Sequence, residues 1–112
     1  MSVPNIQATM VQKLQENSGG ITLIDVREPD EFAEVASTCA KNYPLSNLDV
    51  HSVLESLNLS LSSPDTPLYF ICRSGGRSSR AAEKFYAAGY ENVYNIEGGM
   101  NRWLELGLPT RK

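Results

Sequence analysis

The sequence has 112 residues, of which 41% are hydrophobic and 21% are charged, and these proportions are ordinary for one globular domain with a single hydrophobic core. The formal net charge of −3 argues against a nucleic-acid-binding protein, because contact with many phosphates needs a surplus of Lys and Arg. No apolar run is long enough to cross a membrane, and residues 1–10 lack the basic and apolar regions of a secretion signal, so we expect a single cytoplasmic domain over residues 1–112 without membrane contact.

The N-terminal third of the chain predicts two strands and two helices. A short edge strand is expected around Ile6, and a helix over residues 8–17 would place Met10, Val11 and Leu14 on its core-facing side. Residues 21–25 are typical of a buried strand. Pro29, followed by two acidic residues, predicts the start of a short helix.

Asp25 stands at the C-terminal end of the strand over residues 21–25. In open α/β sheets, functional side chains gather at the C-terminal ends of the strands. We expect Asp25 to accept hydrogen bonds from loop amides or to pair with Arg27, and so to support a site rather than to react.

The middle of the chain predicts a helix followed by a loop. Ser46 and Asp49 have the spacing of a capping box, and an apolar stripe follows at Val50, Val53, Leu54 and Leu57. His51 falls off this stripe and has no second His or acidic-plus-Cys cluster near it in sequence, so we expect it on the surface. Residues 58–67, rich in Ser and Pro, are expected to form a loop.

Residues 68–80, LYFICRSGGRSSR, are the stretch on which the candidate site depends. Residues 68–71 predict a buried strand, and Cys72 stands at its end. Residues 73–77 form a small-residue loop with Arg at each end. An Ala-rich helix is expected over residues 78–89, with one face made by Ala81, Ala82, Phe85, Ala88 and the terminating Gly89.

This order of strand, Cys, loop and helix predicts an activated thiol. The N-terminus of a helix leaves backbone N–H groups free, and a Gly-Gly loop can turn successive amides toward one anion. We therefore expect Cys72 to be held as a thiolate by the loop amides, with Arg73 and Arg77 beside it. A thiolate is a nucleophile, and the same loop could hold an anionic substrate or adduct. The alternative is an inert core thiol, but a purely apolar site would have no use for two arginines and two glycines.

The C-terminal part of the chain predicts a last strand over residues 93–96 and a closing helix over residues 100–106. Trp103 is expected to pack in the core or at its rim. Glu97, which lies between the strand and the helix, could pair with an arginine of the Cys72 loop.

Three motifs resemble those of the single-domain rhodaneses, a family of sulfurtransferases. They are LIDVREPDEF at residues 23–32, CRSGGRS at residues 72–78 and GGMNRW at residues 98–103, and the resemblance runs from about Ile6 to Pro109. It implies an α/β fold with a mostly parallel central sheet of about five strands and helices on both faces.

The resemblance also implies a reaction. Cys72 would take the sulfane sulfur of thiosulfate or a similar small anionic donor as a persulfide, and would pass it to cyanide, to another thiol or to a protein acceptor. Substrate would be bound by Arg73, Ser74, Gly75, Gly76, Arg77 and Ser78, with Asp25 and Arg27 in support. No cofactor or metal is implied.

Three other interpretations remain open at this point. The chain could be a sulfur relay whose donor or acceptor is a protein, or a partner-binding module in which the thiol is idle. It could also be a Cys-based phosphatase or arsenate reductase. Those enzymes need Arg six positions after the cysteine, whereas this chain has Ser78 there. Arg77 comes one residue early, so the loop is tighter than the loop of those enzymes.

Residues 35–45 depart from the family's common Gly-His-Ile-x-Gly-Ala pattern, because Ala36 stands where His would be and Cys39 where Gly would be. Cys39 could act as a resolving thiol for Cys72, but we expect a small, buried structural side chain. With only these two cysteines and no clustered Cys and His, the sequence predicts neither a disulfide framework nor a structural zinc site.

Overall fold

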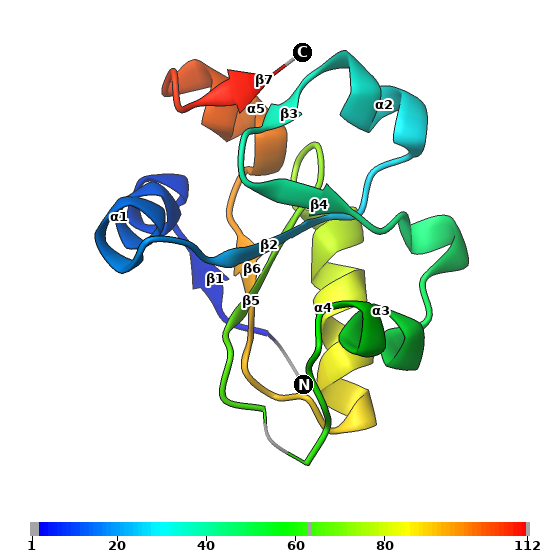
Figure 1. Ribbon diagram of the computed structural model, residues 1–112. Helices are drawn as coiled ribbons and strands as arrows, with labels where there is room; N and C mark the ends of the chain where they lie inside the picture. The colour runs from blue at the N-terminus through cyan, green and yellow to red at the C-terminus, as the bar shows by residue number, and fades with distance from the viewer. Residues whose placement is uncertain (1–2, 63, 112) are drawn as a thin grey trace.

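The computed structural model describes residues 3–62 and 64–111, which form a five-stranded parallel sheet covered by helices on both faces (Figure 1). The order of strands in this sheet is β1-β6-β5-β2-β4, and their bounds are β1 (Asn5–Ile6), β2 (Thr22–Asp25), β4 (Ala40–Asn42), β5 (Leu68–Ile71) and β6 (Val93–Ile96). All the pairings between neighbours are parallel, which confirms the predicted fold class.

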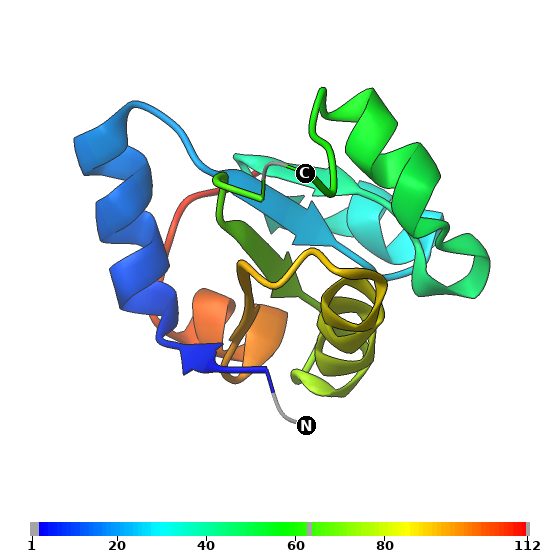
Figure 2. The ribbon, with the colours of Figure 1, turned by 90° about the horizontal axis from the view of Figure 1, so that it is seen from below.

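The helices are α1 (Ala8–Ser18), α2 (Pro29–Glu34), α3 (Val50–Ser56), α4 (Gly76–Ala88) and α5 (Gly99–Glu105), with a 3-10 turn, η1, at Leu45–Asn47. Figure 2 shows α1 on one side of the sheet and α3 and α4 on the other. No helix among the described residues is both long enough and apolar enough to pass through a bilayer.

Two apolar clusters fill the two faces, because successive side chains of a strand point to opposite sides. From β5, Phe70 joins the cluster beneath α3 and α4, together with Phe85 of α4. Ile71 joins the cluster beneath α1 and α5, which contains the fully buried Trp103. The central strand, β5, is therefore buried on both faces, and this fixes the position of Cys72, the residue that follows it.

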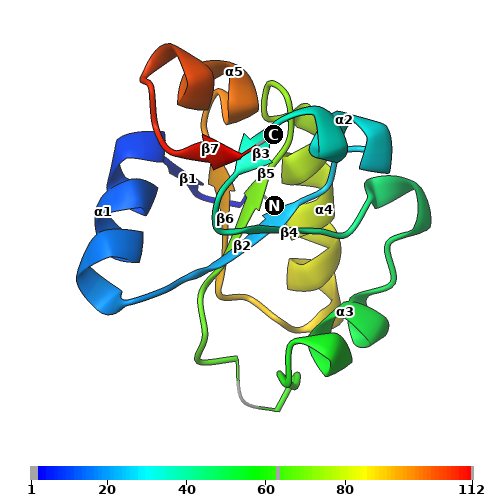
Figure 3. The same ribbon diagram turned by 45° about the horizontal axis from the view of Figure 1, so that its top comes forward.

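The C-terminal ends of the strands carry a second layer of structure. There α2, α5 and a two-stranded antiparallel sheet lie above the main sheet (Figure 3). The small sheet pairs β3 (Ala36–Ser37) with β7 (Thr110–Arg111), and Arg111 also lies over the ring of Phe32 in α2, 4.3 Å from its centroid. The sequence did not predict this pairing, because two strands of two residues carry no periodic signal.

Three sequence predictions about the helices need correction. The capping box at Ser46 was wrong: α3 begins at Val50, because the amide of Leu45 is still bonded to the carbonyl of Val26 and a 3-10 turn follows. The side chain of Met10 is not in the core but 48% exposed, because α1 contacts the sheet mainly through Ala8 and Val11.

The third correction concerns α4, which begins at Gly76 rather than at Ser78. The prediction of its packing face was partly right: Ala81, Ala82 and Phe85 are buried, whereas Ala88 and Gly89 are exposed. The helix therefore starts inside the loop that follows Cys72. His51 is exposed, as predicted.

Candidate active site

Cys72 lies directly after β5, the strand in the middle of the sheet, and only 1% of it is exposed. The register of β2 against β5 places Asp25 beside Ile71, so the ends of these two strands meet next to the cysteine. The loop from Arg73 to Gly75 then turns the chain into α4. The site thus combines a buried strand end, a tight loop and a helix N-terminus, as the sequence predicted.

The N-terminus of α5 holds the start of this loop in place. The amide of Met100 donates to the carbonyl of Cys72 at 2.7 Å, and the amide of Asn101 donates to that of Arg73 at 3.0 Å. Gly99 allows this approach: its φ is +54°, and a Cβ there would clash with the carbonyl oxygen of Cys72 and lie 2.7 Å from that of Arg73. The GGMNRW motif therefore fixes the position of Cys72, although Gly99 lies 27 residues further along the sequence.

The sulfur of Cys72 receives hydrogen bonds from the loop. The amide of Gly75 lies 3.0 Å from Sγ and the hydroxyl of Ser78 lies 3.3 Å from it. Burial opposes the charge and would by itself raise the pKa of Cys72. The hydrogen bonds from the Ser78 hydroxyl and from the amides of Ser78, Gly75 and Ser74 outweigh burial, so the pKa lies below its ordinary value. The thiolate is stabilised by dipoles of the loop and helix start.

Ser78 links the sulfur to a buried amide on β6. Its hydroxyl has one proton and three acceptors within reach: Asn95 Oδ1 at 2.5 Å, the Gly75 carbonyl at 3.2 Å and Cys72 Sγ at 3.3 Å. Asn95 in turn donates through Nδ2 to Oδ1 of Asn5 at 3.0 Å. Asn95 was not among the site residues predicted from the sequence; the available signal was a polar residue on the core-facing side of the predicted strand over residues 93–96.

Asp25 and Arg27 form the buried pair that was predicted. The carboxylate of Asp25 accepts from Arg27 Nε at 3.0 and 3.1 Å, from Arg27 Nη2 at 2.8 Å and from the Arg27 amide at 3.0 Å. Arg27 also donates to the carbonyl of Val35 at 2.7 Å, which fixes the end of α2. Asn42 donates to the carbonyls of Asp25 and Arg27, both at 2.9 Å. This network holds the segment after β2 in place.

The two loop arginines do not pair with Glu97, so that prediction was wrong; Glu97 instead accepts from the side chain of Gln7 at 3.1 Å. Both guanidiniums donate to Glu31 on α2, Arg77 at 2.8 and 3.2 Å and Arg73 at 3.1 Å. The bond from Arg77 is the main cause that lowers the pKa of Glu31, to about 2. The sequence did not predict Glu31 as the partner of these arginines, because it lies 42 residues from Arg73 and 46 from Arg77.

Cys39 lies in the turn between β3 and β4, half-buried, with its sulfur 3.3 Å from the hydroxyl of Ser37. It packs against the apolar cluster beneath α1 and α5, whereas Cys72 belongs to the cluster on the other face. Both cysteines are free thiols. This placement favours the structural role for Cys39 over that of a resolving thiol.

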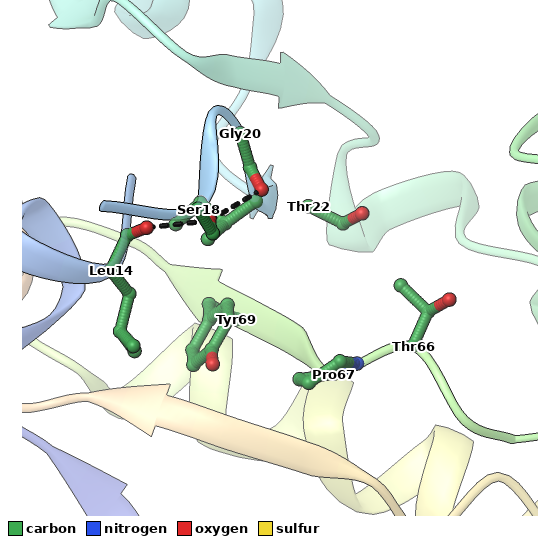
Figure 4. Close-up of a pocket in the computed structure, with 8 residues that line it drawn as sticks. Leu14, Ser18, Gly20, Thr22, Thr66, Pro67 and Tyr69 are labelled. Atoms are coloured by element: carbon green, nitrogen blue, oxygen red, sulfur yellow. Dashed lines mark hydrogen bonds between the residues drawn. The ribbon is translucent and has the colours of Figure 1, made fainter. Parts of the chain in front are cut away.

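A hollow of about 420 Å³ lies at the opposite end of the sheet from Cys72, where β2 and β5 begin (Figure 4). The side chains of Leu14 and Tyr69 line it, and Ser18 bonds the carbonyls of Leu14 and Gly20 at its edge (Figure 4). None of the residues that line it is charged. A small anion would find no counter-charge there, so the Cys72 loop remains the candidate site. Across the described residues, no group of three or more His, Cys, Asp or Glu side chains is placed to hold a metal ion.

The fold is thus a parallel α/β sheet with a cysteine in an amide-lined loop after its central strand. Residues 7–106 match the family described as the rhodanese-like domain, and the chain belongs to this family.

Known relatives include sulfurtransferases. Thiosulfate sulfurtransferase 16 of Arabidopsis thaliana, a chloroplastic protein, is 33% identical over 82% of this chain and 81% of its own length. The solution structure of the polysulfide-sulfur transferase homodimer from Wolinella succinogenes is 29% identical, with a TM-score of 0.75 over 97% of this chain and 78% of that one.

Other relatives are longer than this chain. An uncharacterized protein of Synechocystis is 35% identical over 91% of this chain, but the match covers only 52% of that protein. The match to an uncharacterized protein of Bacillus subtilis covers 59% of that protein.

We predict that Gly99→Ala moves the Cys72 loop, because a Cβ at this position meets backbone that cannot yield without shifting. The free energy of unfolding should fall by about 2 kcal/mol or more, from backbone strain and overpacking together. Gly107→Ala is the matched control, since Gly107 has a φ of +67° but no neighbour within 4 Å of its Cβ position. Urea unfolding should show the larger loss for Gly99→Ala; equal losses would contradict the clash.

We also predict that Ser78→Ala raises the pKa of Cys72, because the thiolate loses its side-chain donor. The rate of alkylation of Cys72 by iodoacetamide, followed by peptide mass as a function of pH, should rise at a higher pH than in the unsubstituted protein. Ser79→Ala, the same change one residue further along α4, serves as the control. A profile unmoved by Ser78→Ala would count against the hydroxyl as a donor to the sulfur.

Proposed function

We propose that this protein is a sulfurtransferase that carries sulfane sulfur as a persulfide on Cys72, with thiosulfate or a similar compound as donor. The observation that carries the proposal is the sulfur of Cys72 itself, which is placed at the end of a buried strand and accepts hydrogen bonds from Gly75 and Ser78. Membership of the rhodanese-like domain family, and relatives named as sulfurtransferases, support the same activity.

The reaction has two steps. In the first, the Cys72 thiolate attacks the outer sulfur of thiosulfate, the S–S bond of the donor breaks, and sulfite leaves with the bonding electrons. In the second, an acceptor such as cyanide or a thiolate attacks the outer sulfur of the persulfide, and Cys72 leaves as the thiolate with which the cycle began. Neither step changes the number of protons, and ping-pong kinetics are expected.

The loop has a physical role in both steps. In the persulfide the negative charge moves to the outer sulfur, one bond further from Cys72, where the same loop amides are the nearest fixed dipoles. Amides fixed before the reaction stabilise such a charge without having to reorient, and in many enzymes this electrostatic stabilisation contributes most of the rate enhancement. Because α5 fixes the loop through the carbonyls of Cys72 and Arg73, the donors stay in place through the cycle.

The loop argues against the phosphatase or arsenate reductase alternative. In those enzymes a guanidinium six positions after the cysteine would bind the oxyanion, but here that position is Ser78, which is buried and bonded to Asn95. Arg77 instead faces α2, where it pairs with Glu31. We therefore expect no turnover of para-nitrophenyl phosphate.

Intact-protein mass spectrometry tests the proposal. Treatment with thiosulfate should add the mass of one sulfur atom to the protein, and later treatment with cyanide should remove it. The adduct should persist in Cys39→Ser and vanish in Cys72→Ser. An unmodified wild-type protein, or an adduct retained by Cys72→Ser, would reject the assignment.

A further inference from the structure

Glu31 is a fixed negative charge at the site, and the proposed reaction does not use it. Its carboxylate accepts from Arg77 and Arg73 and also from the amide of Glu28 at 3.0 Å, as part of the capping box that starts α2. The side chain of Glu31 is 18% exposed, against 29% for Arg77 and 65% for Arg73. The carboxylate is therefore the most buried of the three groups, and it is held by backbone as well as by side-chain donors.

This arrangement changes the charge that a donor meets. The two guanidiniums beside the loop are balanced by the Glu31 carboxylate and by the Cys72 thiolate. A doubly charged donor such as thiosulfate approaches a site without net positive charge, and the two guanidiniums that it meets are already partly neutralised by the Glu31 carboxylate. A donor with one charge or none meets less repulsion from Glu31 and needs neither arginine.

From this we infer that Glu31 is a specificity-determining residue that disfavours doubly charged donors, so that the site takes sulfane sulfur best from a carrier of low charge, such as the persulfide of a thiol. The inference rests on the proposed function and narrows its donor. With a thiol persulfide, Cys72 attacks the outer sulfur, the S–S bond of the donor breaks, and the departing thiolate takes the proton that the outer sulfur carried. Cys72 is left as the same persulfide.

A pair of donors that differ in one charge tests this. Thiosulfate and methanethiosulfonate both present an outer sulfur to the same attack, but the second carries a methyl group in place of one charged oxygen. For each variant we take the ratio of kcat/KM for thiosulfate to kcat/KM for methanethiosulfonate. When this ratio is compared between variants, the intrinsic reactivities of the two donors cancel. Persulfide formation on Cys72 is the readout.

Glu31→Gln should raise this ratio by roughly threefold to tenfold, because it removes the charge that repels the dianion and holds the arginines. Its amide oxygen can still accept from the amide of Glu28, so the capping box is kept. Glu34→Gln is the matched control, since Glu34 is an exposed carboxylate on the same helix, and it should leave the ratio unchanged. In Glu31→Gln, kcat/KM for thiosulfate should also fall more steeply with added salt.

A lower or unchanged ratio in Glu31→Gln would contradict the inference. If Glu31 serves to hold the arginines in place for an anionic donor, Glu31→Gln will lower the ratio, and this outcome or an unchanged ratio overturns the inference. Either result leaves the proposed function standing, because persulfide still forms. Absence of persulfide on wild-type Cys72 with both donors would instead reject the proposed function.

Discussion

The candidate site depends on one interaction, the convergence of hydrogen-bond donors on the sulfur of Cys72. Burial of a charged sulfur is costly unless fixed dipoles replace the water that it loses. Here Gly75 and Ser78 supply those dipoles, and the pKa of Cys72 falls below its ordinary value in spite of burial. The surrounding fold keeps these donors at bonding distance.

Each layer of the fold contributes to that geometry. The sheet buries β5 on both faces and so fixes the cysteine at its end. The N-terminus of α5 binds the carbonyls of Cys72 and Arg73, and Gly99 allows the close approach. On the other side, the buried pair of Asp25 and Arg27 holds the segment from β2 to α2. Cys72 is therefore supported by elements from both halves of the chain.

The site separates two tasks that the sequence suggested were shared. The thiolate is stabilised by amides and a hydroxyl, whereas the arginines of the same loop are bound to Glu31. A substitution at Glu31 therefore leaves in place the two groups, Gly75 and Ser78, that donate to the sulfur of Cys72.

The sequence predicted those parts of the structure that local patterns determine. The alternation of strands and helices, the position of Cys72 and the pairing of Asp25 with Arg27 all follow from residues near one another in the chain. Glu31 and Asn95 could not be placed in this way, because their partners are distant in sequence and only the packed fold brings them together. The start of α3 was wrong for a similar reason, since a bond from Leu45 to the residue after β2 delays the helix.

The most direct test of this account is a titration of the Cys72 thiol, followed by the ultraviolet absorbance of the thiolate in Cys39→Ser, with the Cys39→Ser, Cys72→Ser protein as the blank. We predict that Cys72 ionises below the ordinary cysteine pKa of about 8.5. A thiol that stays protonated up to or beyond that value would contradict it.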